Sequence, residues 1–229
     1  INDKLGAANI LSNIGALYAN TGDDAKSLEY SLQSLAIAEE FNDQVRIGTV
    51  LNNIGNTYQR NQNTYNLSVQ NMKRALAIGE KIKNQGVIVT ANANLGEFYL
   101  KLKKPDSALV FLKKGLEASK NAEDVTTIYI LNNIGKGYDR IGNYDLAIVY
   151  QKKSIELATN LQANQDIGKS MVGLANSYLL TGDIDLALST YQTSAILLLD
   201  SHTLAELILT YAVFKETYAK KGNFDQAFT

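Results

Sequence analysis

Side-chain amides recur through the sequence at nearly regular distances, and their chemistry suits the recognition of a peptide. Four asparagines each stand two residues before a small residue, and they are Asn13, Asn53, Asn94 and Asn133. An asparagine side chain offers two N–H donors and a carbonyl acceptor, so it can bind both the N–H and the C=O groups of an extended peptide. We predict that the four amides form such a binding row. The alternative is that they bond to neighbouring helices and only set the packing of the chain.

Further amides and basic residues stand near this row, and a basic residue follows three of the four asparagines by seven positions. Residues seven apart lie on the same face of a helix. In the fifth copy of the pattern Val172 and Gly173 replace the amides, so the predicted groove ends with the fourth copy. The predicted binding residues are Asn13, Asn52, Asn53, Asn56, Arg60, Asn94, Lys101, Asn132, Asn133, Lys136 and Arg140.

Catalytic and metal chemistry find no support in the sequence. The turns Asp183-Ile184-Asp185 and Asn143-Tyr144-Asp145 resemble calcium ligands, but they lack the 12-residue spacing of an EF-hand and suit helix N-caps. His202 follows Asp200 and Ser201 directly, and adjacent residues cannot form a catalytic relay, so we interpret it as a loop histidine. The sequence shows neither a phosphate-binding glycine loop nor a metal cluster. We therefore expect a protein that is not an enzyme and has no cofactor or metal.

Composition excludes several other classes. The formal net charge of −1 gives no field that would favour nucleic acid or an anionic membrane. The longest apolar runs, of which Ala195 to Leu199 is one, are far shorter than the roughly 18 residues of a membrane span. The chain contains no cysteine, so disulfides and thiolate metal sites are excluded. We expect a cytoplasmic location, with an extracytoplasmic sensor region as the alternative.

A repeat of about 40 residues organises these positions. A tyrosine recurs at steps of 40, 41, 39, 40 and 40 residues, at Tyr18, Tyr58, Tyr99, Tyr138, Tyr178 and Tyr218. Each copy shows apolar residues at helical spacing twice, with a turn between them, which predicts an antiparallel helix pair. Small residues in both helices allow a close approach, and we expect the tyrosine to cover the joint between successive pairs. The small residues are Gly15, Gly55, Gly96, Gly135 and Ala175, with Ser27, Ser68, Ala108, Ala147 and Ala187 as their partners.

The pattern small-x-x-Tyr-x-x-x-Gly-x-x-x-x-Ala resembles the tetratricopeptide repeat over essentially all 229 residues. The period is longer than the usual 34 or so residues, and the Trp and late Pro of the common pattern are absent. Longer repeats of this kind are similar to those of kinesin light chains and bacterial peptide-sensing regulators. They also resemble the arrays that precede kinase or DNA-binding output domains in bacterial signalling proteins. The resemblance implies an all-α, right-handed superhelical solenoid whose first helices line a concave groove, with asparagines that hold peptide backbone and basic residues that hold acidic groups.

We predict a single array of five full repeats and a truncated sixth, at about 4–43, 44–84, 85–122, 123–162, 163–202 and 203–229. Because a helical pattern starts at once and the last helix is cut off, we expect a fragment of a longer protein. The sixth repeat would leave an apolar stripe uncovered and could self-associate through Leu207, Tyr211, Phe214 and Tyr218. The segment Ala195–Leu199 is apolar all round its helix, so we expect it to be buried, either between repeats 5 and 6 or against another domain or protomer.

These observations favour a non-catalytic module that binds a protein or peptide in its concave groove. We expect it to be the sensor or docking region of a larger bacterial signalling or regulatory protein. The alternative is a structural spacer or dimerisation scaffold without a ligand groove.

Overall fold

The computed structural model describes residues 3–119, 122–200, 211–213, 215–216 and 219. All the regular elements within these residues are helices, which confirms the all-α class. Their bounds are α1 Lys4–Thr21, α2 Asp24–Glu40, α3 Gln44–Tyr58, η1 Gln62–Thr64, α4 Tyr65–Ile82, α5 Gln85–Lys101, α6 Pro105–Ala118, α7 Val125–Arg140, α8 Tyr144–Asn160, α9 Asn164–Thr181 and α10 Ile184–Asp200.

Short polar side chains start several of these helices, as the sequence predicts, although α9 starts after Ala163. Asp23, Asp43 and Asn143 each accept a hydrogen bond from the backbone N–H three residues on, which satisfies a donor that has no partner within the helix. The turn at Asn143 is therefore a helix cap, as we interpreted it. Glycine ends α1 and α9 with a left-handed backbone, and in the glycine-free turn after α5 Lys103 takes the same conformation with φ of +56°.

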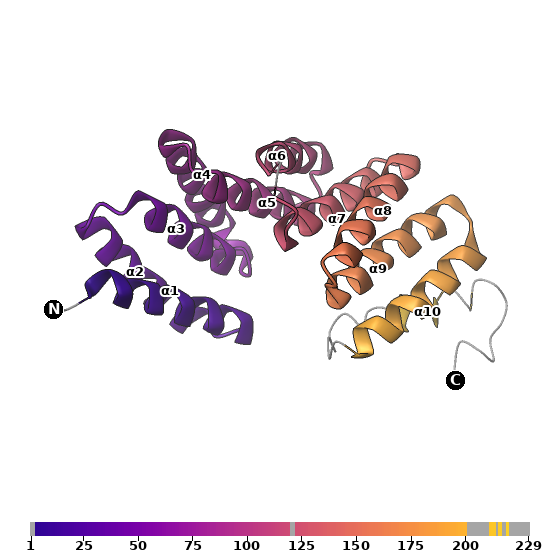
Figure 1. Ribbon diagram of the computed structural model, residues 1–229, viewed down its shortest axis with the longest axis horizontal. Coiled ribbons are helices and arrows are strands. Elements are labelled where there is room, and N and C mark those ends of the chain that lie inside the picture. The colour runs from indigo at the N-terminus through magenta and orange to yellow at the C-terminus, as the bar shows by residue number, and fades with distance from the viewer. Residues whose placement is uncertain (1–2, 120–121, 201–210, 214, 217–218, 220–229) are drawn as a thin grey trace. The chain divides into compact units, whose positions relative to one another are not determined.

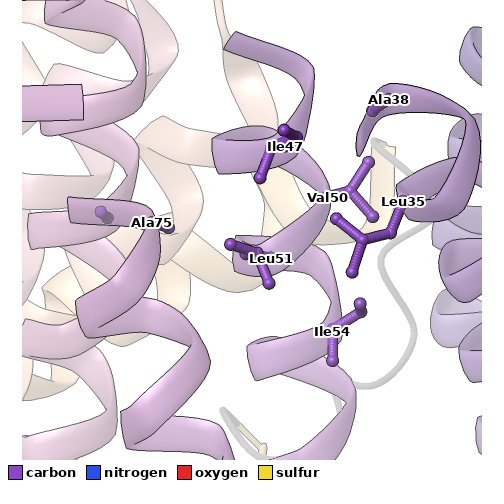
Figure 2. Close-up of a cluster of buried hydrophobic side chains, with 8 residues drawn as sticks. Leu35, Ala38, Ile47, Val50, Leu51, Ile54 and Ala75 are labelled. Carbon is purple, nitrogen blue, oxygen red and sulfur yellow. The ribbon is translucent and has the colours of Figure 1, made fainter. Parts of the chain in front are cut away.

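Residues 1–98 and 117–119 form one compact unit. Within it α1 packs on α2, α2 on α3 and α3 on α4, as Figure 1 shows in its indigo and purple part. Figure 2 shows the core of this unit, where Leu35 and Ala38 of α2 meet Val50 and Ile54 of α3. Successive helix pairs are thus joined by apolar contacts between the second helix of one pair and the first helix of the next.

Residues 99–116 and 120–229 form a second compact unit. Within it α7 packs on α8, α8 on α9 and α9 on α10, and α7 also contacts α9. The ring of Tyr138 stacks on Tyr150 of its own helix pair at 5.5 Å, and Lys113 of α6 lies 5.2 Å from its centre. Tyr138 therefore does contact the preceding pair, as expected, but its main aromatic partner belongs to its own pair.

Small residues do permit close approach between the helices of a pair. A Cβ added at Gly15 would lie 3.1 Å from the backbone oxygen of Ser27, and one at Gly55 would lie 3.2 Å from that of Ser68. Buried serines of the second helices also bond to carbonyl oxygens of the first, at matching positions in three pairs: Ser34 to Ala8, Ser154 to Ile128 and Ser194 to Gly168. The sequence pattern of small residues is thus explained by helix contact.

The predictions for the C-terminal end have different outcomes. Leu207, Phe214 and Tyr218 lie outside the described residues, as does His202, while Tyr211 is exposed. In the apolar segment of α10 Ala195 and Leu198 are buried, whereas Ile196 and Leu199 are 65% and 61% exposed, so the described residues do not bury it all round. Its burial against another domain or protomer stays a prediction. None of the helices in the described part of the chain has the length and apolar character of a membrane span.

Candidate amide rows and a half-buried carboxylate

The predicted binding residues divide into one set in each compact unit. In the first unit Asn13 of α1 is exposed, and Asn53 of α3 is half-buried. The Nδ2 of Asn53 donates a hydrogen bond of 3.3 Å to the Oγ of Ser12, so this amide links α3 to α1. The contact is of the kind that the structural alternative describes.

Three other amides of the first unit are in a different state. Asn52 is almost completely buried, and neither its Oδ1 nor its Nδ2 has a hydrogen-bond partner among the described residues. The Oδ1 of half-buried Asn56, one turn along α3, and the Nδ2 of buried Asn94 on α5 lack partners in the same way. Buried polar groups in native proteins are nearly always hydrogen-bonded, to protein, water or ligand, so these amides have unused bonding capacity.

Arg60 closes the predicted set of the first unit at the end of α3. Its Nη1 lies 3.3 Å from the Oδ1 of Asp24, in the first turn of α2, and both side chains are partly exposed. The guanidinium is therefore already paired with an acid of the preceding helix pair, which reduces its capacity to hold an acidic ligand.

The second unit holds Lys101, Asn132, Asn133, Lys136 and Arg140, of which only the two asparagines are buried. The Nδ2 of Asn132 donates to the Oγ of Ser170 on α9 at 3.5 Å, and the Nδ2 of Asn133 has no hydrogen-bond partner within the described residues. Arg140 donates from Nη1 to the carbonyl oxygen of Leu100 near the C-terminal end of α5. Asn132 and Arg140 thus contact other helices of their own unit.

The side chain of Gln151 of α8 lies at Gly173 of α9, where the row of amides has no member. A Cβ added at Gly173 would lie 2.5 Å from the Cδ of Gln151, so the glutamine carboxamide occupies the space of a side chain at position 173. Gln151 is fully buried, and its Nε2 donates to the backbone oxygen of Asn132 at 3.1 Å. Gln151 therefore supplies an amide to the joint between α7 and α9 at the position where α9 itself has glycine, beside the Asn132–Ser170 hydrogen bond.

Sequence reasoning missed a half-buried carboxylate, Asp139 of α7. Its Oδ2 accepts a hydrogen bond of 3.0 Å from Ser177 of α9, while its Oδ1 is buried without a hydrogen-bond partner in the described part of the chain. Burial raises the pKa of Asp139 to about 6, against the lowering effect of the Ser177 hydrogen bond. The signal available in sequence was that the other first helices carry Ala19, Gln59, Leu100 and Leu179 at this position.

Tyr191 of α10 belongs to the same region. Its ring is fully buried, and its hydroxyl donates a 2.5 Å hydrogen bond to the Oδ1 of Asn176 on α9. Burial, followed by the charges of Asp139 and Glu216, raises the pKa of this phenol, so it stays neutral. In the described residues no group of three or more His, Cys, Asp or Glu side chains could hold a metal ion. The chemistry of these side chains is hydrogen bonding.

Comparisons with known proteins agree with this architecture. The model of the tetratricopeptide repeat family matches residues 6–81, 46–121 and 86–160. The apo form of RapI has a similar structure, with a TM-score of 0.77 and 16% identity over 99% of this chain and 81% of that chain. A Rap protein complexed with Competence and Sporulation Factor gives 0.73 and 14%, over 98% and 73%.

A third similar structure is a signal transduction ATPase (STAND protein) with a tetratricopeptide repeat sensor from Pyrococcus horikoshii. Its TM-score is 0.72 at 17% identity, over 99% of this chain and 36% of that chain. No curated protein matches the chain in sequence. These identities speak for the fold alone, whereas the family model covers residues 6–160 through three overlapping matches. The chain belongs to the tetratricopeptide repeat family.

Proposed function

We propose that the chain is a non-catalytic module that binds a protein or peptide along its first helices, within a larger signalling or regulatory protein. The observation that carries the proposal is the set of amides that stay accessible on the first helices of the first unit, exposed Asn13 and half-buried Asn53 and Asn56. An extended peptide backbone alternates N–H and C=O groups, which are the partners that such amides require. Exposed Asn13 and half-buried Asn53 and Asn56 are the residues that a ligand would contact first.

Two of the similar structures support a role in recognition and signalling. One Rap protein of this fold was solved in complex with Competence and Sporulation Factor, and the STAND protein is described as carrying its repeats as a sensor. The electrostatics of the groove differ from our first expectation, since Arg60 and Arg140 are engaged within the chain. We therefore propose backbone recognition by amides as the main source of affinity, with the basic row in a secondary role.

A structural spacer is the second candidate, and specific contacts favour it. Asn53 bonds to Ser12 and Asn132 to Ser170, so each amide connects first helices of successive pairs. In a spacer these bonds would fix the packing of the pairs and no ligand would compete for them.

A selection experiment distinguishes the two functions. Linear heptapeptides displayed on phage would be selected against the 229-residue chain, and the affinity of synthetic winners measured by titration calorimetry. Asn53→Ala with Asn56→Ala should weaken binding about 5- to 150-fold, because each lost neutral hydrogen bond is worth roughly 0.5–1.5 kcal/mol. The matched control is Gln33→Ala with Gln70→Ala, two exposed amides on α2 and α4.

The result supports the structural spacer, and contradicts peptide binding, if no peptide is enriched over a blank surface or if the Asn53 and Asn56 variant binds as the control does. Circular dichroism of both variants checks that each retains its helices. A variant that unfolds would be replaced by Asn56→Ala alone, whose amide oxygen has no partner to lose.

A further inference from the structure

Two second helices of the second unit carry the same surface pattern. Val110 of α6 is followed by lysines three and four residues on, and Val149 of α8 is followed by lysines in the same way. Residues at this spacing lie together on one face of a helix. Val110 and Val149 are 54% and 44% exposed. The four lysines, which we call the lysine cluster, are exposed as well, and they are Lys113, Lys114, Lys152 and Lys153.

Stacked tyrosines connect the lysines of the two helices. The Nζ of Lys113 lies 5.2 Å from the ring centre of Tyr138 on α7, and the Nζ of Lys153 lies 5.5 Å from the ring centre of Tyr150 on α8. The two rings stack on each other with their centres 5.5 Å apart. Because each ring attracts an ammonium group, the tyrosine pair holds one lysine of each helix beside it. The lysines of α6 and α8 therefore belong to one surface.

The positive charge of the lysine cluster is not compensated within the chain. None of the ion pairs in the described residues involves a lysine of the cluster. The first unit differs at related positions. Arg74 of α4, which matches Lys114 and Lys153 in the repeat, lies 3.0 Å from Glu39, and Lys26, which also lies over a tyrosine ring, is 3.3 Å from Asp23. The second unit thus exposes cations where the first unit pairs them with acids.

The surroundings of the lysine cluster limit what can occupy it. Asp106 and Asp145 stand in the first turns of α6 and α8, and Glu117 and Glu156 follow the lysines by one turn. An extended polyanion, such as a nucleic acid or an anionic membrane, would meet these acids as well as the lysines, and the net charge of −1 does not favour it. A short acidic segment can contact the lysines alone, and apolar side chains in it would cover the exposed valines.

We propose that the lysine cluster, with Val110 and Val149, is a docking surface for a short segment of a partner protein that is rich in acidic residues and also contains apolar ones. The lysines attract and orient the segment, and the valines bury its apolar side chains. The surface is separate from the proposed peptide-binding function, because the accessible amides that carry that function lie on the first helices α1 and α3.

Fluorescence anisotropy with a defined probe tests the proposal. The probe is a labelled peptide of about twelve residues with leucine at every third position and glutamate elsewhere, and a control peptide has glutamine in place of glutamate. At about 20 mM NaCl, where charges are weakly screened, the unaltered chain should bind the glutamate peptide at least about tenfold more tightly than the glutamine peptide. Equal affinities for the two peptides, or no binding of either, would overturn the proposal.

Matched variants test whether the lysine cluster is the binding surface. Lys114→Glu with Lys152→Glu reverses two charges of the cluster and should weaken binding of the glutamate peptide by about tenfold or more. The control, Lys73→Glu with Lys81→Glu, makes the same change of net charge at exposed lysines of α4 and should bind within about twofold of the unaltered chain. Circular dichroism checks that both variants keep their helices. An equal loss in both variants, as a general effect of net charge would give, contradicts the proposal.

Competition experiments separate a protein partner from other polyanions. Phosphatidylserine vesicles and a DNA duplex, each at the same concentration of negative charge as the glutamate peptide, should displace it poorly, and efficient displacement by either would show that the surface does not select an acidic protein segment. The variant Asn53→Ala with Asn56→Ala should bind the glutamate peptide normally, and the Lys114 and Lys152 variant should bind the phage-selected peptides normally. Failure of one proposal is thereby distinguished from failure of the other.

Discussion

Two joints between successive helix pairs show how the same position is filled in different ways. Where α3 meets α1, the amide belongs to α3, the first helix of the second pair, since Asn53 donates to Ser12 of α1. Where α9 meets α7, position 173 is glycine and the carboxamide of Gln151 enters from α8 to donate to the backbone oxygen of Asn132. Both joints thus contain a buried or half-buried amide of the predicted set, Asn53 or Asn132, but only in the second does a further amide enter from the intervening helix α8.

The comparison teaches that an amide row in sequence has two separable causes. A joint needs hydrogen-bonding capacity wherever backbone or side-chain polar groups are buried between helices. A ligand site needs amides that a ligand can also reach, as at exposed Asn13 and half-buried Asn56. The first cause explains Asn53, Asn132 and Gln151, and the second is the basis of the proposed binding function.

The largest loss of stability should follow from placing an asparagine at position 173, in the joint that already holds Gln151. Gly173→Asn would force a Cβ to within about 2.5 Å of the glutamine carboxamide, and overpacking of this kind typically lowers the free energy of unfolding by roughly 1–3 kcal/mol. Urea unfolding followed by circular dichroism measures the change as a lower midpoint.

A second substitution checks the cause of that loss. Gln151→Ser reproduces the residue of the first repeat, where Ser31 stands at the same position. The double variant should lose less free energy of unfolding than the two single variants lose together, because the shorter serine side chain at position 151 leaves the space that the asparagine at position 173 needs. Strictly additive losses would show that Gln151 and position 173 do not compete for space.

Asp139 should make the stability of the joint between α7 and α9 depend on pH. Its pKa of about 6 lies above the ordinary value of 3.8, so the folded state holds this proton more tightly than the unfolded state. The resulting stability is complete below about pH 4 and is lost as the pH rises through about 6. Asp139→Leu, the residue found at the matching positions 100 and 179, should stabilise the fold by about 1 kcal/mol at pH 7.5, after discounting for solvent screening, and by less at pH 5.

Thermal unfolding at the two pH values measures this difference, with Glu156→Leu as a control at an exposed acid on α8. Ser177 keeps its second hydrogen bond, to the backbone oxygen of Gly173, so the leucine does not strand it. An equal gain at pH 5 and pH 7.5 would mean that leucine acts by packing alone.

Sequence was sufficient for the fold because its signals are local. Apolar spacing, small residues at Gly15 and Gly55, and caps such as Asn143 act within a helix or between adjacent helices, so they can be recognised without coordinates. The state of each site residue depends on contacts across about 40 residues. Asn52 and Asn53 are neighbours with similar surroundings in sequence, yet only Asn53 has Ser12 within reach.

The amide of Asn53 should matter for stability where that of Asn13 does not. Asn53→Ala removes the hydrogen bond to Ser12 in a half-buried joint and should lower the free energy of unfolding by about 1 kcal/mol. Asn13→Ala, at an exposed position of the same row, should change it by less than about 0.5 kcal/mol. Urea midpoints of the two variants measure the contrast. Equal effects would remove the distinction between joint and surface amides.

The smallest change in stability is expected for variants of Arg60 and Arg140, which stand at the same position of two repeats and should respond differently to salt. Arg60 forms a partly exposed ion pair with Asp24, and such pairs contribute about 0.2–1 kcal/mol at low salt. Arg140 instead donates to the carbonyl oxygen of Leu100, a neutral group near the end of α5. Arg60→Gln should therefore cost stability at low salt and almost none at 1 M NaCl, where the Debye length falls to about 3 Å. Arg140→Gln should show a loss that changes less with salt, because a hydrogen bond to a neutral carbonyl is screened less than an ion pair. Urea unfolding of both variants at the two salt concentrations compares them directly, and an equal salt dependence would show that the two arginines act by the same kind of contact.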